Sequence, residues 1–154
     1  MGKVETKLRV QGLELPPVAR PVAAYVPTVR SGNMVYTAGQ VPMVTGQLKY
    51  KGKVGADVTL EQGYECARVC ALNCLAAIKG EVGDLDKVVR VVKVTGFVAS
   101  AQGFTDQPKV INGASELLVS VFGDAGKHAR SAVGVAELPL GAPTEVEMIV
   151  EVAE

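Results

Sequence analysis

The sequence predicts an α+β domain in which two helices cover one face of a single mixed β-sheet. Its 154 residues fit one domain. Two segments with helical periodicity alternate with valine-rich segments, and the expected order is β-β-α-β-α-β-β. Both helices can then lie on the same side of the sheet, and the connections through helices predict some parallel pairing. We expect residues 1–154 to form this one domain, with residues 1–20 as an irregular lead-in.

The N-terminal third is expected to contain short strands and loops. Within the lead-in, mixed charges and two adjacent prolines indicate irregular structure, with a short strand at Lys7–Gln11 as its only element. Residues 22–38 predict a hairpin, because turn-forming residues at 30–33 separate two apolar runs. The loop that follows predicts a second short hairpin near Leu48–Lys53.

Two helices are expected in the middle of the chain. The first covers residues 59–79: it begins at a capping box, Thr59–Gln62, and we expect Gly80 to end it. The second covers residues 106–122, where apolar residues recur at helical spacing. Gly123 is expected to end this second helix.

Three further strands are expected at Val88–Val98, Arg130–Glu137 and Glu145–Val152. They contain more apolar side chains than one helix-covered face of a sheet requires. A strand that is apolar on both faces needs cover on both faces. The sequence therefore predicts an oligomer in which another copy of the chain covers the second face.

The composition excludes several classes of function. Lys and Arg number 16 and balance 16 Asp and Glu, and the chain has no Trp. Nucleic-acid binding normally needs a basic excess or aromatic rings that stack on bases. No glycine-rich phosphate-binding motif is present, so we expect no nucleotide cofactor. No apolar run approaches the length of a membrane span or a secretory signal, so we expect a cytoplasmic protein.

The cysteines and the single histidine each allow two interpretations. Cys66, Cys70 and Cys74 lie four residues apart on the first helix. They could form a metal or redox stripe, but no Cys-x-x-Cys motif is present, which favours packing of small side chains. His128 could contact a ligand, although its position in a short polar segment before a strand favours a solvated loop residue.

Arg130 and Glu145 are the candidate site residues that the pattern itself indicates. Strand alternation places Arg130 on one face with Ala132 and Gly134, whose small size would leave a hollow around the guanidinium. Such a hollow suits a carboxylate, although a surface arginine would give the same pattern. Glu145 and Glu147 share one face of the last strand. They could be acids on a solvent-facing strand, or, if that face lines a cleft near Arg130, one of them could activate a water or relay a proton.

Several motifs together resemble the Rid family, also called YjgF-like and, in older annotation, endoribonuclease L-PSP. They are Arg130–Pro139, Glu145–Glu147, Ser31–Pro42 with Tyr25 upstream, and Asn112. The resemblance covers about residues 21–153. It implies a chorismate-mutase-like fold that assembles as a homotrimer, with the sheets forming a central barrel, the helices outside and sites in the clefts between subunits.

The resemblance also implies an activity. The best-known members hydrolyse enamines and imines derived from amino acids, release a 2-oxo acid and ammonia, and use no metal or cofactor. By that resemblance Arg130 holds the substrate carboxylate and Glu145 positions or activates the attacking water. Tyr25 and Asn112 line the pocket, and the backbone near Gly39 helps to hold the substrate.

The sequence departs from the best-known members at three positions. Ala38 stands where many have Ser, Ala132 where many have Cys or Thr, and Gly134 where many have Glu. The pattern is closer to a less characterised subgroup. A cofactor-free imine hydrolase and a non-catalytic binder of 2-oxo acids or of a protein therefore both remain open. Ribonuclease activity, from the older family name, is disfavoured by the zero net charge and the single histidine.

Overall fold

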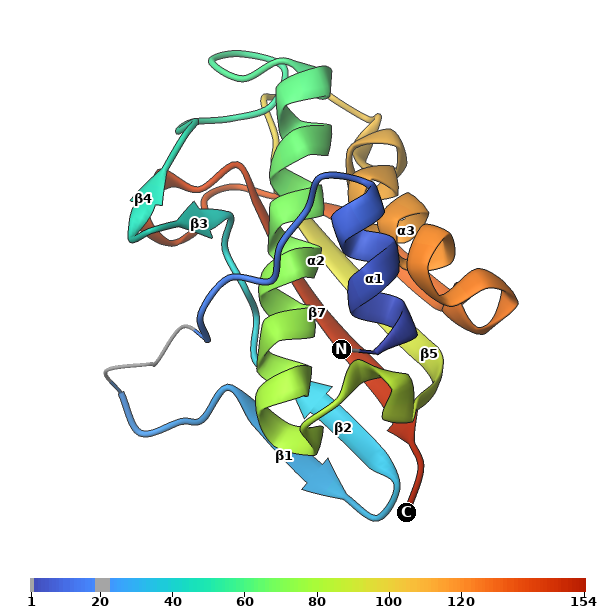
Figure 1. Ribbon diagram of the computed structural model, residues 1–154. Coiled ribbons are helices and arrows are strands. Elements are labelled where there is room, and N and C mark those ends of the chain that lie inside the picture. The colour runs from blue at the N-terminus through green and yellow to red at the C-terminus, as the bar shows by residue number, and fades with distance from the viewer. Residues whose placement is uncertain (1, 19–22) are drawn as a thin grey trace.

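The computed structural model describes residues 2–18 and 23–154 (Figure 1). One five-stranded sheet has the strand order β1-β2-β7-β5-β6, and β3 and β4 form a separate hairpin. The helices are α1 Lys3–Val10, α2 Leu60–Val82 and α3 Gln107–Phe122, with short 3₁₀ turns η1 Leu85–Lys87, η2 Gly123–Gly126 and η3 Pro139–Gly141. The strands are β1 Thr28–Ser31, β2 Met34–Thr37, β3 Met43–Val44, β4 Gln47–Leu48, β5 Val88–Ala99, β6 Ala129–Val135 and β7 Thr144–Val152.

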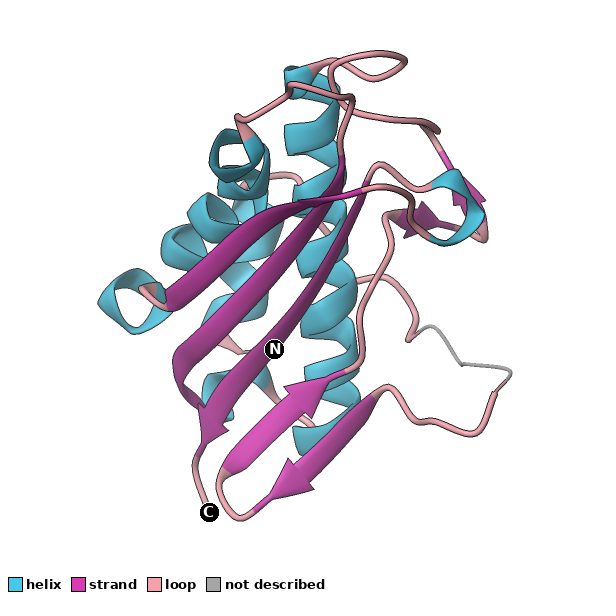
Figure 2. Cartoon of the chain, turned by 180° about the vertical axis from the view of Figure 1, so that it is seen from behind, coloured by secondary structure: helices cyan, strands magenta, loops and turns pink. Residues whose placement is uncertain are grey.

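The sheet is mixed and has helices on one face only, as predicted. Strands β5 and β6 pair in parallel, whereas β1–β2, β2–β7 and β5–β7 pair antiparallel. Seen from behind, the sheet lies in front of the helices, and no helix covers the face turned to the viewer (Figure 2). We call this uncovered side the open face.

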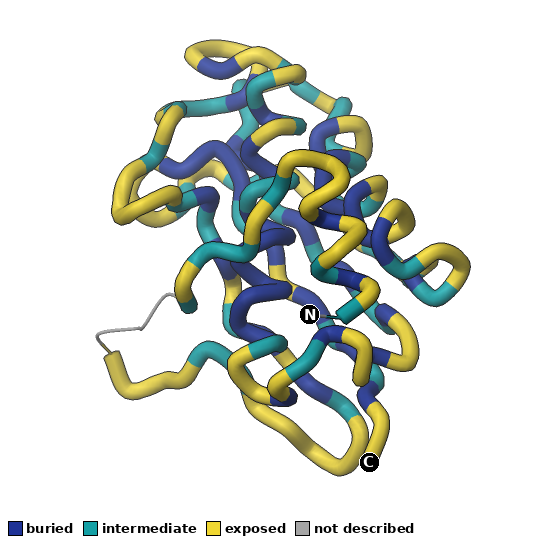
Figure 3. Tube along the Cα trace, in the orientation of Figure 1, coloured by how far each residue is buried: buried dark blue, intermediate teal, exposed yellow. Residues whose placement is uncertain are grey.

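The core lies between the sheet and α2 and α3. Figure 3 shows buried residues concentrated along α2 and in the central strands behind it. On β7 the buried residues Val146, Met148 and Val150 alternate with four partly or fully exposed ones. This alternation, expected from the sequence, directs the apolar side chains to the helices and the glutamates to the open face.

The prediction for the lead-in is wrong. Residues 3–10 form α1, not irregular structure with a strand at Lys7–Gln11. Val4 and Leu8, one helical turn apart, are buried. The backbone N–H groups of Lys3 and Val4 donate to the two carboxylate oxygens of Asp86 at 2.8 and 3.0 Å. This helix cap comes from a residue 83 positions away from Lys3, so no local pattern could indicate it.

Two other boundaries differ from the prediction. Helix α2 continues through Gly80 to Val82 and ends at Gly83, which has a φ of 88°. A positive φ is what glycine tolerates best, so Gly83 is the better helix stop. The second hairpin, expected near Leu48–Lys53, is built from β3 and β4 and reaches that segment only at Leu48, because Thr45 and Gly46 take positive φ values and make the turn.

The first hairpin is confirmed, but its first strand is shorter than expected. Strand β1 begins at Thr28, and residues 19–22, where the expected hairpin begins, lie outside the described part of the chain. Helix α3 and its end at Gly123 agree with the prediction. None of the helices in residues 2–18 and 23–154 is both long and apolar enough to cross a membrane.

The open face carries exposed apolar side chains on three strands. Val29, Tyr36 and Val133 are 56%, 43% and 44% exposed. Their strands belong to the same sheet, and Val29 pairs directly with Tyr36. Of these three, only Val133 belongs to the strands whose apolar excess was noted in the sequence, and most of the other apolar residues of those strands are buried beneath the helices.

We predict that Asp86→Ala lowers the free energy of unfolding by about 1 kcal/mol, because loss of a helix cap costs this much. Urea denaturation at fixed protein concentration measures this free energy.

The two backbone donors lower the pKa of Asp86. Its contribution is therefore complete above the unfolded-state pKa of about 3.9 and is lost as the pH falls through the lower folded-state pKa.

The matched control is Asp124→Ala, which removes an exposed carboxylate paired with Lys127. This change should alter stability by less than about 0.5 kcal/mol. Equal losses in both variants would show that Asp86 does not dock α1.

Candidate functional site

Arg130 lies on β6 and its side chain is directed to the helix-covered face. It pairs with Val94 of β5, which is buried beneath the helices. Its Nη1 donates to Asn112 Oδ1 at 2.8 Å and to Ser115 Oγ at 3.1 Å. Both acceptors lie on α3, one helical turn apart. The structure thus brings together two of the predicted site residues, Arg130 and Asn112.

The small residues beside Arg130 do not leave the hollow that the sequence led us to expect. A Cβ at Gly134 would overlap the side-chain amide of Gln107 at the start of α3. Ala132 packs against the core. The Gln107 side chain from α3 therefore occupies part of the space beside Gly134.

Glu145 lies on β7 and faces the opposite way, on the open face with its neighbour Phe97 of β5. It contacts the segment after β2: a Cβ at Gly39 would overlap the Glu145 carboxylate. That segment is fixed by two backbone hydrogen bonds, from Gln40 N–H to Val146 O at 2.8 Å and from Val146 N–H to Gln40 O at 3.0 Å. Glu145 and Gly39, both predicted as site residues, therefore form a second cluster.

The environment of Glu145 alters its acidity. Partial burial raises the pKa of the Glu145 carboxyl above its ordinary value, and the neighbouring charge of Glu147 raises it further. A carboxyl group with a raised pKa exchanges protons closer to neutral pH. This is the property that a general acid–base catalyst needs.

Thr37 fixes the end of β2 just before Gly39, and no sequence pattern identified it as a functional residue. After β2 separates from β7, the Thr37 hydroxyl accepts a hydrogen bond from Met148 N–H at 3.0 Å, in place of a backbone partner. Backbone pairing resumes at Gln40. The side chain therefore bridges the gap in the ladder that precedes Gly39.

The two clusters lie on opposite faces of one sheet. Arg130 with Asn112 is on the helix side, and Glu145 with Gly39 is on the open face. Tyr25 is 57% exposed in the segment before β1 and makes no hydrogen bond to the other four predicted residues. One chain therefore holds four of the five predicted residues in two separate clusters and does not bring all five together.

His128 is not the solvated loop residue that its sequence context favoured. It is half-buried between η2 and β6. Its Nδ1 lies 2.6 Å from Gly126 O, and its Nε2 lies 2.9 Å from Ser115 Oγ. Burial lowers the pKa of His128, the hydrogen bond to Gly126 O raises it, and the Arg130 charge lowers it again, so that the net shift is downward. The ring therefore lies beside the Arg130 cluster in a neutral form at neutral pH.

All three cysteines are buried, and Cys70 and Cys74 pack between α2 and β7. Cys74 Sγ donates to Val146 O at 3.3 Å, and Cys70 Sγ lies 3.3 Å from Thr144 Oγ1. Burial raises the pKa of Cys66 to about 11 and that of Cys74 to about 12, so both remain thiols at neutral pH. Across the described residues, no group of three or more His, Cys, Asp or Glu side chains is arranged to hold a metal ion.

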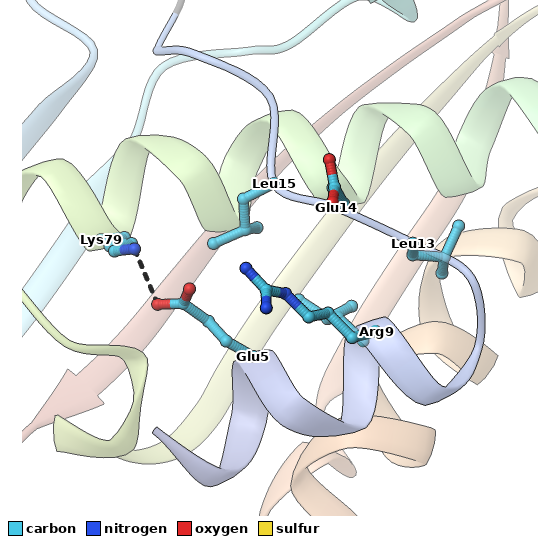
Figure 4. Close-up of a pocket in the computed structure, with 7 residues that line it drawn as sticks. Glu5, Arg9, Leu13, Glu14, Leu15 and Lys79 are labelled. Atoms are coloured by element: carbon cyan, nitrogen blue, oxygen red, sulfur yellow. Dashed lines mark ion pairs between the residues drawn. The ribbon is translucent and has the colours of Figure 1, made fainter. Parts of the chain in front are cut away.

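A separate pocket of about 170 Å³ lies between α1, the segment after it and α2 (Figure 4). Lys79 Nζ and Glu5 Oε1 are 2.8 Å apart across it, and the Arg9 side chain points into it beside Leu15. None of the predicted site residues lines this pocket. Its ion pair joins α1 to α2, so the pocket is a consequence of the way α1 docks.

Comparison with known proteins gives a consistent result. The family model described as "YjgF/chorismate_mutase-like, putative endoribonuclease" matches residues 5–152. Protein TCP17 of Trypanosoma cruzi is 45% identical over 97% of this chain and 94% of its own. The 2-iminobutanoate/2-iminopropanoate deaminase of Escherichia coli K12 is 33% identical over 83% of this chain and 87% of its own. The crystal structure of Atu1372 from Agrobacterium tumefaciens, titled as of unknown function, superposes with a TM-score of 0.92 at 45% identity, covering 97% of this chain and 92% of that one. The chain therefore belongs to the YjgF/Rid family and has its chorismate-mutase-like fold.

Proposed function

We propose that this protein hydrolyses imines and enamines derived from amino acids to 2-oxo acids and ammonia. The observation that carries the proposal is the anchored guanidinium of Arg130. Within the described residues only its Nη1 makes hydrogen bonds, to Asn112 and Ser115. The Nη2 and Nε donors are left for a substrate carboxylate, which binds arginine through two parallel hydrogen bonds. The E. coli relative named as a deaminase supports this substrate class.

Glu145 supplies the proton transfers in this proposal. The substrate enters as the protonated imine, and a water oxygen bonds to its carbon while the Glu145 carboxylate takes one of the water protons. The resulting tetrahedral carbon carries a hydroxyl and a neutral amino group. Glu145 then returns its proton to the nitrogen, and the C–N bond breaks as ammonia leaves. The hydroxyl proton passes back to the Glu145 carboxylate and from there to the ammonia, so the products are the 2-oxo acid and an ammonium ion. The raised pKa of Glu145 suits both directions of transfer. No metal or cofactor takes part in these steps.

The complete site takes its two halves from two copies of the chain. Arg130 and Glu145 lie on opposite faces of the sheet, so a cleft that contains both joins the β6 edge of one copy to the open face of another. Exposed Val29, Tyr36 and Val133 on the open face support such an assembly. A homotrimer with one repeated head-to-tail contact closes this arrangement into a ring. Tyr25 and Gly39 then line the cleft on the Glu145 side.

A binding protein without turnover is the second candidate. Ala38 and Ala132 carry no polar side-chain atom where many family members carry one, and Gly134 carries no carboxylate. These differences favour binding of a 2-oxo acid at Arg130 with little catalysis. Ribonuclease activity is a weaker third candidate. The zero net charge and the few aromatic residues do not favour it.

Arg130→Ala should reduce imine hydrolysis at least ~30-fold, because loss of one partner of a charged contact in a cleft costs about 2–5 kcal/mol. Arg130→Lys should restore little, since an ammonium group lacks the planar pair of donors. The assay generates 2-iminobutanoate in situ and follows its hydrolysis. Arg9→Ala, which changes an exposed residue of α1, is the control and should retain full activity. If the wild type does not hydrolyse imines but binds 2-oxobutanoate through Arg130, the binding function replaces the catalytic one.

Mixed assemblies test whether two chains share one site. Arg130→Ala and Glu145→Gln should each be nearly inactive alone. After dissociation and reassembly as an equal mixture, about one site in four should combine an intact Arg130 with an intact Glu145. Activity should therefore recover to about a quarter of the wild-type value, and light scattering should give three chains per particle. A monomer at micromolar concentration, or no recovery from confirmed mixed trimers, would refute the shared site.

Glu147→Gln should lower the pKa of Glu145, because it removes a neighbouring negative charge. Glu145 acts as a base only when ionised, so activity rises with pH through its pKa. In Glu147→Gln this rise should move to lower pH, measured as kcat/KM across the acid range. Glu151→Gln, on the same strand and the same face, is the matched control and should move the profile less. Equal shifts in both variants would argue against a local effect at Glu145.

A further inference from the structure

Four polar groups from two elements and the turn between them form one continuous chain of hydrogen bonds. Gly126 O is 2.6 Å from His128 Nδ1, and His128 Nε2 is 2.9 Å from Ser115 Oγ. Ser115 Oγ in turn is 3.1 Å from Arg130 Nη1. The only histidine of the sequence thus reaches the candidate substrate-binding arginine through one hydroxyl group.

The positions of the protons in this chain follow from its two ends. A carbonyl oxygen can only accept, so His128 Nδ1 carries a proton and donates it to Gly126 O. A guanidinium nitrogen can only donate, so Ser115 Oγ accepts from Arg130 Nη1. In the neutral ring Nε2 is then an acceptor, and the Ser115 hydroxyl donates to it. Each hydrogen bond in the chain therefore has only one possible donor. The Ser115 hydroxyl hydrogen points to His128 Nε2, and a lone pair of Ser115 Oγ points to Arg130.

The two hydrogens of Arg130 Nη1 are both used by this arrangement. One is donated to Asn112 Oδ1 and the other to Ser115 Oγ. The Nη1 end is therefore fixed, and the edge formed by Nη2 and Nε is the one that can receive a carboxylate. We propose that Ser115 and His128 are positioning residues that hold the Arg130 guanidinium with this edge presented to the carboxylate of the substrate. The inference rests on the proposed function and identifies the parts of the chain that orient its key residue.

A neutral His128 is part of the arrangement. In a positively charged ring Nε2 carries a hydrogen and can no longer accept from Ser115, so the Ser115 hydroxyl would be free to rotate. The charged ring would also repel the guanidinium of Arg130, two residues along the chain. Half-burial and the Arg130 charge disfavour protonation of the ring, and together they outweigh the hydrogen bond to Gly126 O, which favours it. The nearby Lys127 and Asp124 form an exposed ion pair with each other at 3.3 Å.

Two amide substitutions of His128 separate positioning from simple packing. In His128→Gln the side-chain carbonyl reaches the place of Nε2 and can accept from Ser115. In His128→Asn the shorter amide reaches the place of Nδ1 and can donate to Gly126 O, but it cannot reach Ser115. Both variants are uncharged, so they differ in which half of the hydrogen-bond chain they retain.

We expect His128→Gln to keep KM within about twofold of the wild type. His128→Asn and Ser115→Ala should each raise KM by about three- to tenfold, the effect of one lost hydrogen bond. The double variant His128→Asn with Ser115→Ala should be no worse than Ser115→Ala alone, because both changes break the same chain. Thermal unfolding checks that every variant is folded. Equal KM values for Asn and Gln variants that differ only in melting temperature would overturn the proposal.

Two further measurements distinguish this proposal from the proposed function. If the protein binds 2-oxobutanoate without hydrolysing imines, Kd for that acid replaces KM and the same order of variants is expected. If it does neither, the proposed function fails. Nitrogen NMR of isotope-labelled protein then decides the hydrogen-bond chain alone. The wild type should show His128 protonated at Nδ1, and Ser115→Ala should speed rotation of the Arg130 guanidinium. A ring protonated at Nε2, or unchanged rotation, would refute the positioning pair.

Discussion

The close approach of α3 to the sheet and to α2 is the constraint on which the candidate site depends. A Cβ at Gly96 on β5 would overlap Ile111, and a Cβ at Gly134 on β6 would overlap Gln107. On the other side of the helix, a Cβ at Gly113 would overlap the backbone carbonyl of Tyr64 on α2. A backbone atom cannot move aside as a flexible side chain can. Glycine at position 113 therefore permits the close packing of α3 on α2. In that position α3 places Asn112 and Ser115 within hydrogen-bond distance of Arg130.

Strand alternation is the second constraint, and it separates the site into halves. Successive side chains of a strand point to opposite faces, so the paired strands β5, β6 and β7 direct Arg130 to the helices and Glu145 away from them. No rotamer change can carry a side chain through a packed sheet. If one reaction uses both residues, it needs a second copy of the chain, and assembly then becomes a condition of activity rather than only a source of stability. The exposed apolar residues of the open face are where such an assembly can gain free energy.

The elements were predictable where local patterns determine them. The alternation of β7, the capping box of α2 and the end of α3 at Gly123 are each confirmed, because each depends on residues close in sequence. Helix α1 was missed because its cap is Asp86, and the predicted hollow beside Arg130 is partly filled because the Gln107 side chain from α3 lies next to Gly134. The link from His128 to Arg130 could not be predicted either, since it exists only once α3 lies over β6.

The Arg130 cluster is formed within one chain, whereas Glu145 needs a second copy of the chain to meet it. This difference bears on whether the protein is a hydrolase or a binding protein. The Arg130 half is complete within one chain: its donors are anchored by Asn112 and Ser115 before any partner arrives. In the Glu145 half the pKa of the carboxyl is raised, and in the proposed reaction Glu145 acts only on a substrate that the Arg130 half of another copy holds. Ala38 lies next to Gly39, on the Glu145 side, and offers no hydroxyl to orient a water. Substitutions on that side can therefore weaken turnover while leaving carboxylate binding intact, and evolution from a hydrolase to a binding protein would need no change at Arg130.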